Sequence, residues 1–332
     1  MAITPDQVHW FSDTFANVVR NVERVIIGKT EAIRLAVTCL VAEGHLLLED
    51  YPGTGKTTLA RALAQSVEGT SSRIQFTPDL LPSDVTGVTI YDQKTGQFEF
   101  HQGPIFASVV LADEINRASP KTQSSLLEVM EENRVTVDGK SYSVGQPFMV
   151  IATQNPIEQA GTYKLPEAQL DRFLIKTSIG YPDRSSTVEL LSGAATKDRS
   201  GALSPIITTQ AVRDMIDLGT TVHVDGAVLD YIAELAEKTR EADETRLGVS
   251  VRGAMAMVRA AKVWAASQGR NYVLPDDVKD LVPHVWTHRL VLDPEAEFTG
   301  ATAPAVITRV LAQVPAPQQR SAAPASAGTT ES

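Results

Sequence analysis

The residues with the clearest chemical potential lie in the segment 46–58, which reads LLLEDYPGTGKTT. An apolar run leads into glycines, and a helical pattern follows. Backbone N–H groups of the glycines can close around phosphate oxygens, at a helix N-terminus whose dipole attracts anions. Lys56 can reach β- and γ-phosphates, and the Thr57 hydroxyl can ligate Mg²⁺. Asp50 takes the place of the first glycine of the full motif. The expected nucleotide contacts are Gly53, Thr54, Gly55, Lys56, Thr57 and Thr58.

Two carboxylates follow a second apolar run, Val109 to Ala112. Asp113 and Glu114 would lie at the carboxyl end of a buried parallel strand, the edge at which such sheets bind ligands. Asp113 would hold Mg²⁺, directly or through water, and Glu114 would act as the general base on the attacking water. An isolated Asp-Glu pair is often no more than two solvated acids at the start of a loop. The presence of Lys56 and Thr57 in the same chain favours a catalytic pair instead.

A third apolar run, Phe148 to Thr153, is followed at once by Gln154, Asn155 and Pro156. Asn155 could orient the lytic water beside a γ-phosphate. An Asn before a Pro is also an ordinary turn signal, and from these residues alone the turn is the preferred interpretation.

The elements that must position these residues alternate between apolar runs and amphipathic segments. This alternation predicts an α/β domain with a parallel sheet. Two segments, 88–100 and 134–144, alternate with period two around Thr95-Gly96 and Asp138-Gly139, and predict β-hairpins. The expected strands are His45 to Leu48, Arg73 to Phe76, Ser108 to Ala112, Phe148 to Thr153 and Phe173 to Thr177. The helices expected here are Thr4 to Arg24, Thr30 to Ala42, Thr57 to Glu68 and Lys121 to Glu132.

After Pro182 the strand runs stop and helical patterns dominate. We therefore expect a nucleotide-binding α/β domain over 1–182, a small all-helical lid over 183–313 and a disordered Ala/Pro/Ser-rich tail over 314–332. Pro283 should kink the last lid helix. The expected lid helices are Val212 to Leu218, Gly226 to Arg240, Val251 to Gln268 and Asp276 to Arg289.

Composition limits the function classes. The chain has 332 residues, 30 Lys+Arg and 40 Asp+Glu, which gives a net charge of −10. This charge disfavours general binding to nucleic acid or to anionic membranes. The single cysteine, Cys39, excludes an intrachain disulfide and favours a reducing compartment. No secretory signal or membrane-spanning run is visible, so we expect a soluble cytoplasmic protein without membrane insertion.

Four motifs together resemble the MoxR family of AAA+ ATPases, in the clade that carries a helix-2 insert. The resemblance runs from about Ile26 to Arg289. The motifs are Pro52 to Thr57, Leu111 to Ala118, Ala152 to Pro156 and Leu165 to Phe173.

The resemblance assigns roles to these motifs. It implies that they contain Walker A, Walker B, sensor 1 at Asn155 and an arginine finger at Arg172. It also implies a sensor 2 arginine at Arg252, although Val251 stands where the family often has proline. The two hairpins resemble the helix-2 insert and the pre-sensor-1 hairpin of this clade.

Physical reasoning is compatible with these roles. A guanidinium suits the charge that develops on a transferring phosphoryl group, and an arginine on the far side of a domain reaches phosphate only in a head-to-tail ring. From the residues alone, Arg172 could instead pair with Asp171 or Glu167, and Arg117 could be a contact to a neighbour or a loop cap. Exposed aromatic residues of the first hairpin could bind a partner or pack on the chain's own core.

The expected function is therefore that of an ATP hydrolase that uses ATP and Mg²⁺. By resemblance it is a chaperone-like remodeller of partner proteins, acting as a homo-oligomeric, hexameric ring on clients that can carry a von Willebrand factor A domain. The alternatives are a helicase-like nucleic-acid motor of the same clade and a chelatase-type subunit for metal insertion. The net charge of −10 and the sparse cations on the hairpins count against the motor.

Overall fold

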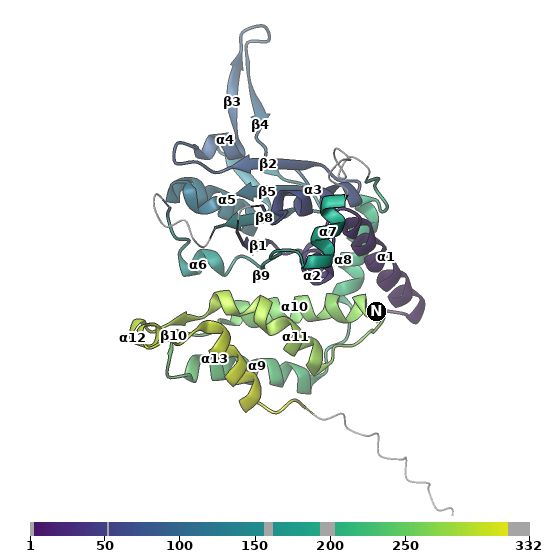
Figure 1. The fold of residues 1–332 in the computed structure, drawn as a ribbon. Coiled ribbons are helices and arrows are strands. Elements are labelled where there is room, and N and C mark those ends of the chain that lie inside the picture. Colours follow the sequence, from purple (N-terminus) through teal and green to yellow (C-terminus); the bar gives the residue numbers. More distant parts are fainter. Residues whose placement is uncertain (1–2, 52, 156–161, 193–202, 318–332) are drawn as a thin grey trace, which may run out of the picture.

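A parallel sheet forms the centre of the molecule in the computed structural model, which describes residues 3–51, 53–155, 162–192 and 203–317 (Figure 1). Neighbouring strands of the sheet all pair in parallel. The carboxyl ends of the strands therefore meet at one edge of the sheet. The strand order is β2 (Ser71–Gln75), β5 (Val109–Asp113), β8 (Met149–Gln154), β1 (Leu46–Glu49) and β9 (Ile175–Thr177).

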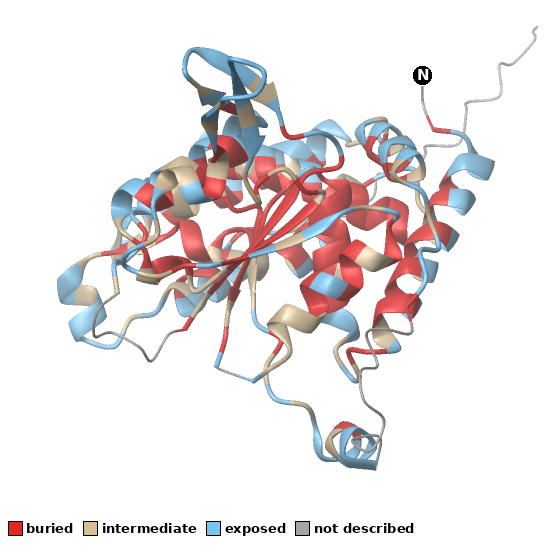
Figure 2. Cartoon of the chain, turned by 90° about the horizontal axis from the view of Figure 1, so that it is seen from above, coloured by how far each residue is buried: buried red, intermediate tan, exposed pale blue. Residues whose placement is uncertain are grey.

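The inner strands are buried on both faces, as their continuous apolar runs predict. Figure 2 shows the middle of the sheet as buried. Successive residues of β1 enter different clusters: Leu46 and Leu48 pack with the helices on one face, whereas Leu47 packs on the other. β2 differs from the prediction, because only Ile74 in it is buried. It is the last strand of the sheet and has a neighbour, β5, on one side only.

Helices cover both faces of the sheet. On one face lie α1 (Pro5–Glu23), α2 (Thr30–Val41) and α3 (Lys56–Ser66), whose buried residues share a cluster with β1. On the other face lies α5 (Pro120–Glu132), next to the short helix α4 (Pro82–Thr86). The predicted helices of this region are confirmed, and Cys39 on α2 is fully buried.

Both predicted hairpins are present. The first, β3 (Gly87–Asp92) with β4 (Gln97–Gln102), projects away from the sheet (Figure 1). Its aromatic residues have different environments, since Phe98 is 73% exposed whereas Phe100 stacks on Tyr142 with ring centroids 4.2 Å apart. Tyr142 belongs to the second hairpin, formed by β6 (Arg134–Val137) and β7 (Lys140–Ser143). The Phe100–Tyr142 pair therefore joins the two hairpins.

The C-terminal part is mainly helical, and it contains a pair of short strands that the sequence did not predict. β10 (Thr245–Leu247) pairs antiparallel with β11 (Val291–Leu292). The last predicted lid helix is also shorter than expected, because α11 ends at Val285, shortly after Pro283, and a 3₁₀ turn follows. Pro283 lies inside α11 and removes one backbone N–H from it, yet the N–H of Trp286 still donates to the carbonyl of Val282 beyond the proline. The remaining helices are α6 (Glu167–Leu170), α7 (Arg184–Ser192), α8 (Thr209–Thr220), α9 (Gly226–Glu241), α10 (Val251–Ser267), α12 (Pro294–Phe298) and α13 (Ala303–Gln313), and the 3₁₀ turns are η1 (Ile115–Arg117) and η3 (Thr287–Arg289).

One continuous hydrophobic cluster joins the C-terminal helices to the α/β part. It contains residues of α1, α2 and β1 together with residues of α8 to α11. The predicted boundary near Pro182 falls between β9 and α7, and the division into domains stays a prediction.

The predicted tail begins too early. Val314 is 3% exposed, and its N–H donates to the carbonyl of Val310, so it belongs to the ordered end of α13. The rest of the predicted tail, from residue 318 on, lies outside the described residues, as do Pro52 and Pro156 of the sequence motifs. Within the described ranges, no helix has the length and apolar character needed to cross a bilayer.

Candidate nucleotide-binding site

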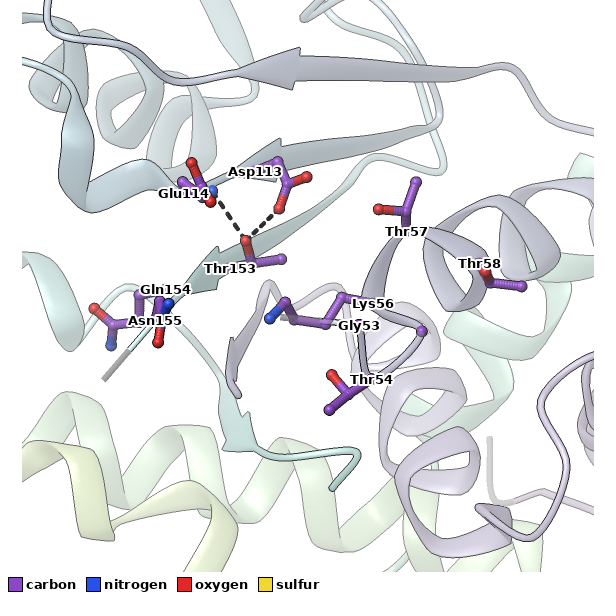
Figure 3. Close-up of a pocket in the computed structure, with 11 residues that line it drawn as sticks. Gly53, Thr54, Lys56, Thr57, Thr58, Asp113, Glu114, Thr153, Gln154 and Asn155 are labelled. Carbon is purple, nitrogen blue, oxygen red and sulfur yellow. Dashed lines mark hydrogen bonds between the residues drawn. The ribbon is translucent and has the colours of Figure 1, made fainter. Parts of the chain in front are cut away.

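A cavity of about 390 Å³ lies at the carboxyl edge of the sheet, over the start of α3 (Figure 3). It brings together the predicted loop residues, both predicted acids and Asn155. The site therefore assembles from segments that follow β1, β5 and β8. The lining residues are Gly53, Thr54, Gly55, Lys56, Thr57, Thr58, Asp113, Glu114, Thr153, Gln154 and Asn155.

Glycine shapes the loop after β1. Gly53 has φ 81° and Gly55 has φ 95°, values that other residues rarely adopt. Among the residues that the structure describes, no side chain caps the start of α3, so its first N–H groups can face a bound anion. Lys56 Nζ donates to the carbonyls of Asp50 and Tyr51, each at 2.8 Å, and so lies folded against its own loop.

Asp50 anchors this loop, a role that sequence reasoning missed. Its carboxylate is almost fully buried and accepts N–H bonds from Ile179 and Gly180 at 2.7 and 2.8 Å. It also accepts the N–H of Tyr51 at 2.9 Å. A glycine has no side chain that could make these bonds. The substitution at the first motif position therefore ties the phosphate loop to the turn after β9.

The predicted base, Glu114, has a constrained backbone. Its φ of 57° and ψ of 49° place a non-glycine residue in the left-handed region, which is typical of functional sites. Its N–H donates to Thr153 Oγ1 at 2.9 Å, and that hydroxyl donates to Asp113 Oδ1 at 2.6 Å (Figure 3). Thr153, on β8, therefore fixes both acids relative to each other.

Side chains outside the predicted set hold the two carboxylates. Arg73 Nη2 lies 2.7 Å from Asp113 Oδ2, and Gln75 Nε2 donates to Glu114 Oε2 at 2.9 Å. Both come from β2, whose exposed residues the sequence analysis did not consider. Arg117 Nε lies 3.1 Å from the same Glu114 oxygen, so in this structure Arg117 contacts the predicted base of its own chain.

The cavity contains oxygen ligands of the kind that Mg²⁺ prefers. Thr57 and Asp113 both line it, next to the space for phosphates. Among the described residues, no group of three or more His, Cys, Asp or Glu side chains could hold a metal ion by itself.

The two predicted arginines do not line this cavity. Arg172 Nη2 lies 2.9 Å from Glu131 Oε2, and Arg252 Nη2 lies 2.8 Å from Glu131 Oε1. The alternative prediction, an ion pair of Arg172 with Asp171 or Glu167, is therefore wrong. Both arginines line a smaller cavity of about 200 Å³ together with residues 43–45, which precede β1. The phosphate loop follows β1, so this arginine cluster lies at the opposite edge of the sheet.

A buried arginine, Arg289, fixes the segment that carries Arg172. Its Nε lies 2.7 Å from Asp171 Oδ1, and its Nη2 donates to the carbonyl of Phe173 at 2.8 Å. Burial lowers the pKa of Arg289, while the charge of Asp171 opposes that effect. Arg289 comes from the C-terminal part of the chain, so it connects that part to residues 171–173 of the α/β part.

A phosphate loop on a parallel sheet of this order, with acids at the end of β5, defines a P-loop AAA+ ATPase. Comparison with known proteins agrees. Residues 45–175 match the model "ATPase family associated with various cellular activities (AAA)", and residues 237–310 match the AAA lid domain.

Relatives along most of the chain define the family. The chain is 39% identical to Chaperone MoxR1 of Mycobacterium tuberculosis over 92% of its own length and 83% of that protein. It is 49% identical to the uncharacterized protein YeaC of Bacillus subtilis, over 92% of this chain and 95% of YeaC. A crystal structure of a putative ATPase from Cytophaga hutchinsonii superposes with a TM-score of 0.88 at 36% identity, covering 94% of this chain and 98% of that one. The chain belongs to the MoxR family of AAA+ ATPases.

Proposed function

We propose that this protein hydrolyses Mg-ATP in a head-to-tail ring of six subunits and uses the cycle to remodel partner proteins. The observation that carries the ring is the separation of the phosphate loop from Arg172 and Arg252. They lie at opposite edges of one sheet, so a single chain does not bring either of these two arginines to its own phosphate loop. A neighbour in a closed ring would present its arginine edge to the loop edge.

The predicted site residues of the cavity each have a role in this proposal. The loop N–H groups and Lys56 bind the phosphates, and Thr57 with Asp113 would hold Mg²⁺, which when bound neutralises charge on the phosphates. Glu114 takes the proton from the attacking water, while Asn155 orients that water. Arg172 and Arg252 of the adjacent subunit would stabilise the negative charge that develops on the transferred phosphoryl group.

The remodelling role is supported by the family rather than by the cavity. The relative MoxR1 is named a chaperone, and the MoxR resemblance implies protein clients, some with a von Willebrand factor A domain. The exposed Phe98 and Tyr91 on the projecting hairpin offer apolar surface to such a client. A net charge of −10 argues against nucleic acid as the principal partner.

Mixing two inactive variants tests the ring. Lys56→Ala removes phosphate binding and Arg172→Ala removes the arginine, so each homogeneous protein should lose most of its ATP turnover. Mixed subunits should recover part of it, because some junctions then pair an intact loop with an intact arginine. The absence of recovery in mixtures that sedimentation shows to be assembled would contradict catalysis across subunits.

The partner class is tested separately, by adding DNA or RNA to the ATPase assay at physiological salt. We expect no stimulation. A strong stimulation that salt abolishes would favour the helicase-like alternative.

A further inference from the structure

Glu131, at the C-terminal end of α5, contacts both arginines that the proposed function assigns to a neighbour's nucleotide. One carboxylate oxygen lies 2.9 Å from Arg172 Nη2, and the other lies 2.8 Å from Arg252 Nη2. Arg172 belongs to the α/β part and Arg252 lies in the first turn of α10 in the C-terminal part. The single carboxylate of Glu131 therefore brings together two guanidinium groups that are far apart in the sequence.

The surroundings explain why an anion is needed there. The 200 Å³ cavity is lined by Arg259 and Arg289 as well as by Arg172 and Arg252. Asp171 Oδ1 lies 2.7 Å from Arg289 Nε, so the charge of Asp171 is paired with that of Arg289. Glu43 also lines the cavity, but the acid in ion-pair contact with both Arg172 and Arg252 is Glu131, and its charge offsets the mutual repulsion of the two guanidinium groups.

The ion pair with Glu131 satisfies only part of the hydrogen-bonding capacity of Arg172. Its Nε is buried and has no hydrogen-bond partner among the described residues, so the guanidinium uses only part of its donor set. The backbone on either side of it is fixed by Arg289, which binds Asp171 and the carbonyl of Phe173. The side chain of Arg172, rather than its backbone, is therefore the part that can change partner.

We infer that Glu131 occupies, within one subunit, the place that the γ-phosphate of a neighbour's nucleotide takes in the ring, and so competes with that phosphate for Arg172 and Arg252. The inference rests on the proposed function, because it needs both arginines to act on a neighbour. A phosphoryl group carries more negative charge and more acceptor oxygens than a carboxylate, so it is the stronger partner for two guanidinium groups. Docking of a nucleotide-loaded neighbour would then displace Glu131.

The competition has a measurable consequence for assembly. Two partly exposed ion pairs must be given up when the neighbour docks, which weakens nucleotide-dependent association by about three- to tenfold. Glu131→Gln keeps the shape of the side chain but loses the charge. This variant should therefore associate at lower subunit concentration in Mg-ATP.

The experiment measures ATP turnover per subunit against subunit concentration for the full chain. Glu131→Gln should reach half-maximal turnover at a concentration about three- to tenfold below that of the unsubstituted protein. Glu132→Gln is the matched control, since it removes the same charge from the neighbouring exposed position of α5 and should leave the midpoint unchanged. Thermal unfolding verifies that both variants fold, and sedimentation in Mg-ATP gives the association midpoint independently of activity.

The outcomes separate this inference from the proposed function. If the unsubstituted protein shows turnover that is independent of concentration and no assembly, catalysis across subunits fails. If its turnover depends on concentration but Glu131→Gln has the same midpoint, or a higher one, only the competition is wrong. An equal shift of the midpoint concentration in Glu132→Gln would show that the effect comes from the net charge of the chain, and would also contradict the competition.

Discussion

Glu114 combines a strained backbone with a carboxylate that two donors hold. Gln75 and Arg117 both contact its Oε2, and these contacts fix the position of the carboxylate in the cavity. Glu114→Gln should keep nucleotide affinity but lower turnover by at least about a hundredfold, because the amide cannot accept the proton of the attacking water. Nucleotide titration together with steady-state ATPase assays checks both parts. Unchanged turnover would show that another residue is the base.

Thr153 gives a second prediction at the residue scale. Its hydroxyl accepts the N–H of Glu114 and donates to Asp113, so Thr153→Val would leave both groups without this partner. We expect a loss of stability of about 1–3 kcal/mol and a clear fall in turnover. Thr153→Ser keeps the hydroxyl and is the matched control. Equal behaviour of the two variants in thermal unfolding and ATPase assays would contradict the proposed positioning role.

At the scale of elements, Asp50 links the phosphate loop to the turn that follows β9. Asp50→Ala would leave the N–H groups of Ile179 and Gly180 without their acceptor, at a cost of about 2–4 kcal/mol. The loop would also lose its anchor, so we expect weaker nucleotide binding. Urea unfolding and nucleotide titration measure the two effects. Retained stability with intact nucleotide affinity would show that the anchor is dispensable.

The elements that the sequence predicted well are those whose pattern is local. Continuous apolar runs gave β1, β5 and β8, and turn residues within alternating segments gave both hairpins. The contacts of Arg73, Gln75 and Glu131 were not predictable in this way. They depend on which strand lies beside β5 and on which side chains meet α5, and a one-dimensional pattern does not contain that information.

The same distinction applies to the site. The predicted phosphate-loop and strand-end residues do line one cavity, because their positions along the chain follow from one loop and two strand ends. The partner of Arg172 was missed because Asp171 and Glu167 are close to it in sequence, whereas Glu131 is close to it only in space. Asp50 was noticed as a departure from the motif, but its bonds to residues after β9 required the fold.

At the scale of the whole molecule, a buried histidine makes stability depend on pH. His45 Nε2 lies 2.8 Å from the carbonyl of Met130, and its Nδ1 accepts the N–H of Val150 at 3.0 Å. These partners suit the neutral ring, and burial lowers the pKa of His45 to about 4. Its ordinary pKa in an unfolded chain is about 6.5. The stabilisation is therefore present above about pH 6.5 and is lost as the pH falls toward 4.

Comparison of pH 7.5 with pH 5 measures this contribution. With a folded-state pKa of about 4, His45 should account for a loss of about 2 kcal/mol in the free energy of unfolding over that interval. His45→Gln removes the titrating group, so its unfolding free energy should fall less than that of the unsubstituted protein. Identical losses in both proteins, measured by urea unfolding, would contradict the assignment.

The continuous hydrophobic cluster also determines where motion can occur. Since α8 to α11 share one core with α1, α2 and β1, rotating the C-terminal helices away from the sheet would expose buried apolar surface at a high cost in free energy. Each subunit should therefore behave as a single rigid block during a nucleotide cycle. In a ring of such blocks, work on a client would come from changes in the angle between adjacent subunits, with the nucleotide held at the hinge.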